Sequence, residues 1–211
     1  MSLVAISGNP SGTGTLTIAA PNTNSNYTLT LPQATTTLVG DDATQTLTNK
    51  TIQGGAITRG TAVASTSGTS IDFTGLPAWC KKITVMFSGV STSGTSQYQV
   101  QLGNGSVVTS GYLSGNTTLN SAGSNLVTAT SGIIVFQPSA SADTCVGSLV
   151  LNLISSNTWI GTGVAYRTNT AATQHMAGSL ALGGTLDRVR ITTVNGTDAF
   201  DAGTVNILYE G

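Results

Sequence analysis

The chain has 211 residues, enough for one sizeable domain with an appendage or for two small domains. Only 7% of the residues are charged, the net charge is −1, and no cluster of Lys and Arg exists to neutralise nucleic-acid phosphates, which excludes duplex nucleic acid as a partner. No apolar run approaches the length of about 18 residues that a membrane span needs, so we expect no membrane insertion. Residues 1–10 lack a signal-peptide pattern, so we expect the protein to assemble in a cytoplasm.

The first 45 residues contain no Lys or Arg. Within them, residues 15–18 and 27–31 alternate polar and apolar side chains, and the turn-rich stretch 21–26 separates them. This pattern predicts a β-hairpin. Because a lone two-stranded hairpin is only marginally stable in water, we expect it to pack on sister copies or on a docking surface. Its apolar face carries Leu16, Ile18, Tyr27, Leu29 and Leu31.

The heptapeptide TLTNKTI, residues 46–52, separates this region from the longer remainder of the chain. It places Leu47 and Ile52 among polar and β-branched neighbours, which is too little apolar surface to fold alone. We expect it to need a partner chain or another layer, and an ordinary surface linker is the alternative. The chain is therefore predicted to consist of an attachment and oligomerisation segment, residues 1–55, and a second domain, residues 56–211.

The second domain shows the period of two that is typical of half-buried β-strands. Further strands are expected at 56–67, 106–113, 133–136, 159–167 and 175–182, and a loop at 116–125. Short strands with Gly, Ser and Thr between them predict an all-β fold, an antiparallel, jelly-roll-like β-sandwich. The apolar sets in these strands are Ile71 and Phe73; Ile83, Val85 and Phe87; Tyr98, Val100 and Leu102; Leu149, Leu151 and Leu153; Leu186, Val189 and Ile191; and Val205, Ile207 and Tyr209.

Residues that carry chemistry are few. His175 is the only histidine, and no nucleophile-elbow pattern accompanies the many serines, so we expect no enzyme and no cofactor. A pair among Asp187, Asp198 and Asp201 could in principle serve glycoside hydrolysis, and Asp198 with Asp201 could bind Ca²⁺. Turn stabilisation by Asp198 and Asp201 is the alternative that we favour.

Two further groups of residues have structural interpretations. Cys80 and Cys145 are expected to be free buried thiols, with a disulfide as the alternative. The glycines in 103–105 and 161–163 are expected to form turns, because the context of a phosphate-binding loop is missing around them.

Recognition surfaces are expected on loops, since a rigid sandwich presents its loops to partners. The loops at 91–96, 116–125 and 168–175 are the candidates. Trp159 follows a polar stretch, and an aromatic ring near a loop can stack on a sugar face, although core packing is the default interpretation. The candidate receptor-facing residues are Tyr112, Asn116, Trp159, Tyr166, Asn169 and Gln174.

Several stretches resemble phage virion fibre and tail-fibre proteins. TLTNKTI and the preceding SGTGTLTIAAPNTNSNYTLTLPQATTTLVG, residues 11–40, are similar to the N-terminal part of such proteins, in which a GTLTI-AP-turn-TLTLP hairpin is followed by TTTLV. GTSIDFTGLPAWCKKITVMFSGVSTSGTS, residues 68–96, resembles the opening of their C-terminal domain. The similarity covers roughly the first 100 residues and is weaker in 186–211.

The resemblance implies a structural fibre protein of a tailed phage virion, a homotrimer whose residues 1–55 bind other virion proteins. The C-terminal β-sandwich would then form a knob that contacts a glycan or protein on the host surface. Two alternatives remain: a head fibre or capsid decoration protein without a receptor, and a polysaccharide depolymerase.

Overall fold

A computed structural model describes residues 11–14, 22–26, 28 and 57–211 of the chain. The regular elements of these residues are all β-strands. In chain order they are β1 (Ile57–Arg59), β2 (Val63–Ala64), β3 (Ser70–Thr74), β4 (Lys82–Thr92), β5 (Tyr98–Asn104), β6 (Ser106–Val107), β7 (Leu113–Asn120), β8 (Gly123–Ala129), β9 (Ile133–Phe136), β10 (Cys145–Ser155), β11 (Thr158–Arg167), β12 (Ala172–Ala181), β13 (Arg188–Thr193) and β14 (Phe200–Glu210). The part of the chain that the structure describes has no helix able to cross a lipid bilayer.

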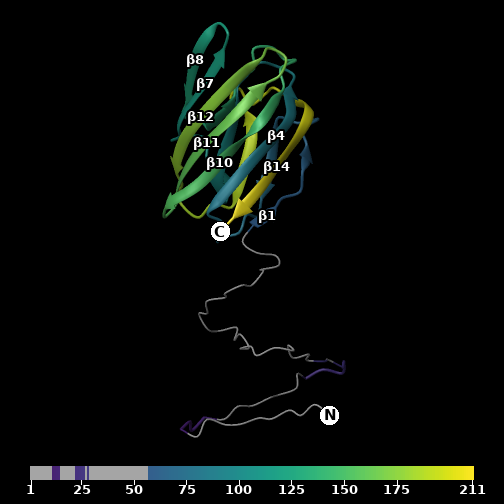
Figure 1. Ribbon diagram of the computed structural model, residues 1–211, viewed down its shortest axis with the longest axis vertical. Helices are drawn as coiled ribbons and strands as arrows, with labels where there is room; N and C mark the ends of the chain where they lie inside the picture. Colours follow the sequence, from purple (N-terminus) through teal and green to yellow (C-terminus); the bar gives the residue numbers. More distant parts are fainter. Residues whose placement is uncertain (1–10, 15–21, 27, 29–56) are drawn as a thin grey trace. The chain divides into compact units, whose positions relative to one another are not determined.

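The strands form two antiparallel sheets packed against each other (Figure 1). The large sheet has the order β1-β14-β4-β10-β11-β12-β7-β8, with β2 also paired to β14. The small sheet has the order β3-β13-β5-β6, with β9 also paired to β5. The predicted all-β class and antiparallel β-sandwich are thus confirmed.

The hydrophobic core lies between the two sheets, because alternate side chains of each strand point to the same face. The rings of Tyr98 and Phe136 pack at its centre with their centroids 4.9 Å apart. Leu153 and Tyr209 are only partly buried against this core. The predicted alternations are otherwise confirmed, with these side chains buried: Ile71, Phe73, Ile83, Val85, Phe87, Tyr98, Val100, Leu102, Leu149, Leu151, Leu186, Val189, Ile191, Val205 and Ile207.

Two glycines form a hollow on the inner face of the large sheet. Gly161 of β11 lies directly opposite Gly178 of β12, and a Cβ atom at either position would lie 3.0 Å from the side chain of Ile133. The missing side chains let Ile133 pack against these strands, and all four residues of β9, the strand expected at 133–136, are buried. The turn expected at 161–163 is wrong, because these residues lie within β11.

Several polar segments differ from the expectations. Residues 116–125, expected as a loop, form most of the β7–β8 hairpin, in which Asn116 and Thr118 point inward and are buried. Residues 106–113 contain only the short β6 and the start of β7. The strand expected at 56–67 is split into β1 and β2. Between them Gly60 lies so close to β14 that a Cβ atom there would be 2.9 Å from Ile207.

The chain joins the sandwich beside its own C-terminus. In the β1–β14 pair Ile57 lies opposite Glu210, and Trp79 packs at the same end with its ring 5.8 Å from that of Tyr209. The connections 93–97, 137–144, 168–171 and 194–199 gather at the opposite end, near the top of Figure 1. We call this opposite end the loop end.

Most of the predicted attachment segment, including all of its named apolar residues, falls outside the described residues, and its role stays a prediction. The same holds for the boundary predicted between residues 55 and 56, although contacts along the chain divide it nearby, into Met1–Lys50 and Thr51–Gly211. The attachment residues concerned are Leu16, Ile18, Tyr27, Leu29, Leu31, Leu47 and Ile52.

Candidate ligand site

A polar surface forms on the outer face of the small sheet because three strands align there in register. Thr192 of β13 lies between Ser70 of β3 and Gln99 of β5. One step along the same face, Arg190 lies between Asp72 and Gln101. The alternate residues of these strands are apolar and point into the core, so the outward residues form two polar rows.

These rows form the floor of an open pocket of about 340 Å³ that extends to the loop end. Pockets that bind small ligands start at roughly 300 Å³, so the volume suits one sugar unit or a ligand of similar size. The lining is dominated by hydroxyl and amide groups. It comprises Thr69, Ser70, Gln99, Gln101, Thr109, Ser131, Arg190, Thr192, Thr193, Val194, Asn195 and Gly196.

Hydrogen bonds hold the amides of the pocket in fixed orientations. Gln99 donates from Nε2 to the carbonyl of Thr193 at 3.3 Å, and its Oε1 accepts a bond from the Ser131 hydroxyl at 2.8 Å. Gln101 donates from Nε2 to the carbonyl of Ser131 at 2.9 Å. Both glutamines are less than 5% exposed, so their polar groups are ordered before any ligand arrives. Gly132 makes room for Gln99, since a Cβ atom there would lie 2.7 Å from Oε1.

One ion pair sets the electrostatics of the pocket edge. Arg190 donates from Nε and Nη2 to the two carboxylate oxygens of Asp72, at 2.7 and 2.9 Å. This bidentate contact raises the pKa of Arg190 and keeps the guanidinium charged. Because the pair is locally neutral, the pocket offers directional hydrogen bonds more than net charge.

Four of the candidate receptor-facing residues are buried instead. Tyr112, Asn116, Trp159 and Gln174 are each at most 2% exposed. Trp159 occupies an inward position of β11 opposite Leu153, so it packs in the core. These four side chains therefore cannot contact a receptor in this fold, and the expectation that they face one is wrong.

Burial of the three polar members of that group has a specific cause in each case. The hydroxyl of Tyr112 accepts a bond from the backbone N–H of Leu102 at 2.6 Å and donates to the carbonyl of Val108 at 3.0 Å, while burial raises its pKa to about 12. Asn116 and Gln174 both bond to Gln137, which lies in the connection after β9. These buried bonds hold the connection after β9, at the loop end, from within the sandwich.

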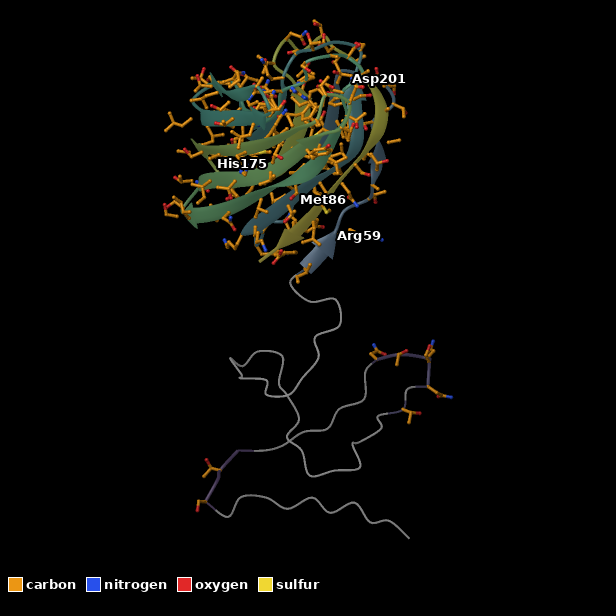
Figure 2. The ribbon with its side chains drawn as sticks, turned by 45° about the horizontal axis from the view of Figure 1, so that its top comes forward. Arg59, Met86, His175 and Asp201 are labelled. Carbon is orange, nitrogen blue, oxygen red and sulfur yellow. The ribbon has the colours of Figure 1, made fainter. Side chains whose placement is uncertain are left out.

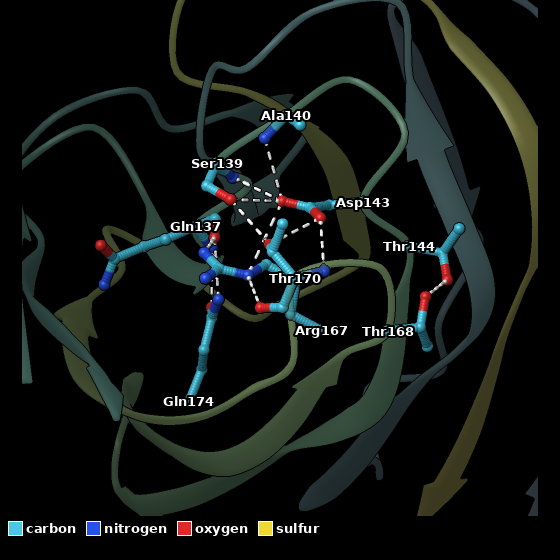
Figure 3. Close-up of polar contacts among 9 residues, drawn as sticks. All are labelled: Gln137, Ser139, Ala140, Asp143, Thr144, Arg167, Thr168, Thr170 and Gln174. Atoms are coloured by element: carbon cyan, nitrogen blue, oxygen red, sulfur yellow. Dashed lines mark hydrogen bonds and ion pairs between the residues drawn. The ribbon is translucent and has the colours of Figure 1, made fainter. Parts of the chain in front are cut away.

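That connection is held by a buried polar network (Figure 3). Asp143 is fully buried, and its carboxylate accepts bonds from the backbone N–H groups of Ser139 and Ala140 at 2.6 and 3.0 Å. It also accepts bonds from the N–H and hydroxyl of Thr170 at 3.1 and 2.8 Å. Arg167 lies 3.6 Å from the carboxylate and donates from Nη1 to the carbonyl of Gln137 at 3.0 Å.

The network keeps Asp143 ionised. Burial alone would raise the pKa of this carboxyl, but the bonds from Ser139, Thr170 and Ala140 outweigh burial and hold the pKa well below its usual range. Its hydrogen-bonding capacity is used within the protein. We therefore assign the network to fixing the connections at 137–144 and 168–171.

Tyr166 and Asn169 are exposed but lie away from the pocket. Tyr166 is on the outer face of the large sheet, and Asn169 is in the turn between β11 and β12. The loops expected at 91–96 and 168–175 are shorter than predicted, since β4 continues to Thr92 and β12 begins at Ala172.

The three acidic residues near the C-terminus, Asp187, Asp198 and Asp201, accept hydrogen bonds within the sandwich. Asp198 accepts bonds from the N–H of Ser96 at 3.0 Å and from Nδ2 of Asn195 at 2.7 Å, and Asp201 accepts one from the hydroxyl of Ser91. Asp187 bonds to Arg188 and to the N–H of Gly105. The contacts of Asp198 fit the turn-stabilising interpretation, whereas Asp201 lies within β14 and accepts its bond from β4. The described residues contain no group of three or more His, Cys, Asp or Glu side chains placed to bind a metal.

Cys80, Cys145 and His175 lie apart from the pocket. Cys80 and Cys145 are free and buried, which confirms the expectation of two free thiols, and burial raises the pKa of both. His175 lies at an outward, exposed position of β12 (Figure 2).

Sequence reasoning missed the pocket residues. The signal was present in YQVQLG and RVRITT, where Gln99, Gln101, Arg190 and Thr192 alternate with buried apolar residues. Such alternation identifies outward-facing side chains, but it does not reveal that two strands about 90 residues apart in the chain are neighbours. Comparison with protein families, curated proteins and solved structures finds no match to this chain.

Proposed function

We propose that this chain is a fibre protein of a tailed-phage virion, and that its β-sandwich binds a hydroxyl-rich glycan of the host surface in the pocket on the small sheet. Residues 1–55 attach the protein to other virion proteins and hold sister chains together as a homotrimer. The resemblance of residues 11–40, 46–52 and 68–96 to fibre proteins supports the first part. The ordered amides and hydroxyls of the pocket carry the second.

The pocket lies away from the point at which the chain joins the sandwich, which supports binding of a ligand outside the virion. The chain joins the sandwich at Ile57, beside Glu210, whereas the pocket extends to the loop end through Asn195 and Gly196. A ligand bound there lies away from the point of attachment. Because a virion carries many copies, weak binding at each pocket adds up to firm attachment through avidity.

Replacing Gln101 by alanine is expected to weaken glycan binding by the full-length protein about 5- to 10-fold. The change removes one ordered amide from the pocket floor, and a single hydrogen bond contributes about 1 kcal/mol. Binding to an array of neutral and acidic oligosaccharides measures the effect. Thr74→Ala is the matched control, because Thr74 is exposed on the small sheet but lies outside the pocket lining.

Two outcomes would contradict the glycan site. One is a wild-type protein that binds no oligosaccharide on the array, and the other is a Gln101→Ala variant that binds as well as wild type. The same protein incubated with polysaccharide tests the proposal of binding without catalysis. New reducing ends released by the purified chain would show a depolymerase instead.

A second candidate is a head fibre or capsid decoration protein that binds no receptor. One observation favours it: the pocket lining contains no aromatic ring, whereas aromatic faces are a common platform for sugars. This alternative predicts that the purified protein binds virions lacking it but does not bind host cells. The attachment proposal predicts that it binds both.

A further inference from the structure

The outer face of the large sheet is uncharged over five neighbouring strands. The outward positions of β10, β11, β12, β7 and β8 carry no Asp, Glu, Lys or Arg. Arg167 is the only such residue in these strands, and it points inward into the buried network. We call this surface the uncharged face. His175 is its one titratable side chain other than the phenol of Tyr166, and it marks the middle of the face in Figure 2.

Large apolar side chains lie exposed across this face. Strand register places Val146, Tyr166, Thr173 and Leu119 in one continuous row across β10, β11, β12 and β7. The next row runs through Ser148, Val164, His175, Thr117 and Leu126. Exposed fractions are 64% for Leu126, 48% for Val164, 46% for Tyr166, 44% for Leu119 and 43% for Val146.

The exposed charges of the sandwich lie elsewhere. Asp72, Arg188 and Arg190 are on the small sheet, and Asp187 precedes it. On the large sheet, Lys82 and Glu210 form an ion pair of 2.9 Å on β4 and β14, beyond the five strands. In a chain of low charge, the two outer faces of the sandwich thus differ: the small sheet carries ion pairs and the pocket, and the large sheet is neutral over the five strands from β10 to β8.

The size of the uncharged face suits a stable contact between proteins. Five strands of 7 to 11 residues, at about 3.3 Å per residue and about 4.8 Å between strands, present roughly 700 Å². A standard interface takes about 800 Å² from each partner, and its centre is depleted of charged residues.

We propose that the uncharged face packs against a second copy of this chain. This contact brings no charges together, and none of the side chains of the face requires an opposite charge on the neighbouring copy. Small outward residues, such as Gly115 and Ala177 near the middle, allow the backbones to approach closely. The contact leaves the small sheet, with its pocket, on the outside of the assembly. This inference does not depend on whether the pocket binds a glycan.

Replacing Val164 by lysine is expected to weaken self-association of the full-length chain at least tenfold, because it places a charge in the middle of each face. Light scattering over a range of protein concentrations measures the mass against multiples of the 21.2 kDa chain. Thr74→Lys is the matched control, since it adds the same charge at an exposed position of the small sheet. Thermal unfolding checks that both variants are folded. A monomeric wild-type chain overturns the proposal.

If residues 1–55 alone keep the copies together, Val164→Lys leaves the mass unchanged. A second measurement therefore probes the uncharged face directly. Thr162→Cys places a thiol at an exposed position of the uncharged face, while the native thiols of Cys80 and Cys145 are buried. We expect slow maleimide labelling in the assembled protein and at least tenfold faster labelling when Val164→Lys is added. Fast labelling without Val164→Lys overturns the proposal. So does slow labelling in a monomer, which would mean that the chain's own N-terminal residues cover the face.

Discussion

Replacing Asp143 by alanine is expected to lower the free energy of unfolding by about 3–5 kcal/mol, because it leaves the buried Arg167 without its counter-charge. It also leaves the N–H groups of Ser139, Ala140 and Thr170 without their acceptor. Chemical denaturation of the purified variant measures the loss. Asp198→Ala is the control, since that carboxylate also accepts a backbone N–H bond but is only half-buried. We expect it to cost about 1 kcal/mol.

A double variant separates the two causes of this loss. In Asp143→Ala with Arg167→Met the buried charge is gone, and only the unsatisfied backbone groups remain. We expect the double variant to recover about 2 kcal/mol relative to Asp143→Ala alone. A double variant as unstable as the sum of both single variants would show that the ion pair contributes nothing beyond the hydrogen bonds.

The contribution of Asp143 is also expected to depend on pH. Its pKa in the folded protein lies below the unfolded value of about 3.9, so the stabilisation is complete above that value and is lost as the pH falls towards the folded pKa. The difference in unfolding free energy between wild type and Asp143→Ala should be constant from pH 7 to about pH 5. Below about pH 4 it should shrink by about 1.4 kcal/mol per pH unit. A difference that stays constant down to pH 2 would contradict the assignment.

Gly203→Ala is expected to destabilise the sandwich by roughly 3–4 kcal/mol. Gly203 has φ of +93° at an irregularity in the β14–β4 pairing, and a Cβ atom there would lie 2.4 Å from the carbonyl oxygen of Gly89. The substitution therefore combines an unfavourable backbone conformation with a clash against backbone that has no room to move. The shift in the denaturation midpoint of the purified protein measures the effect.

Gly75→Ala isolates the conformational part of that effect. Gly75 has a similar φ of +75°, but no atom lies within 4 Å of the position that its Cβ would occupy. We expect a loss of about 1–2 kcal/mol there. Equal losses at Gly75 and Gly203 would mean that the close approach of Gly203 to Gly89 has no energetic consequence.

The strands that can be predicted from the sequence are those whose inward side chains are apolar. The alternation of Ile83, Val85 and Phe87 identifies β4 and its inward face, because each of these residues must leave water. It fails for β7, where Asn116 and Thr118 occupy the inward positions and bond to other polar groups there. A strand whose buried face is polar has no hydrophobic period, and so it resembles a loop in the sequence.

The candidate ligand site could not be predicted from the sequence for a different reason. Gln99 and Gln101 are recognisable as outward-facing residues of a strand, but their neighbours Thr192 and Arg190 come from the far end of the chain. Trp159 illustrates the reverse error, because an aromatic residue near a polar stretch suggested a sugar platform and the alternation within β11 turned it inward. Pairing between distant strands decides both cases, and one sequence does not specify that pairing.

The pairing of Ile57 with Glu210 has a mechanical consequence. A sandwich held at its loop end and pulled at Ile57 bears load along the axis that β1 shares with its antiparallel partner β14. The hydrogen bonds between these strands run perpendicular to that direction, so the pull strains all of them together rather than one after another. Since β14 lies between β1 and β4, the tension passes directly into the long central strands of the large sheet. The domain is thereby arranged to resist traction along its axis.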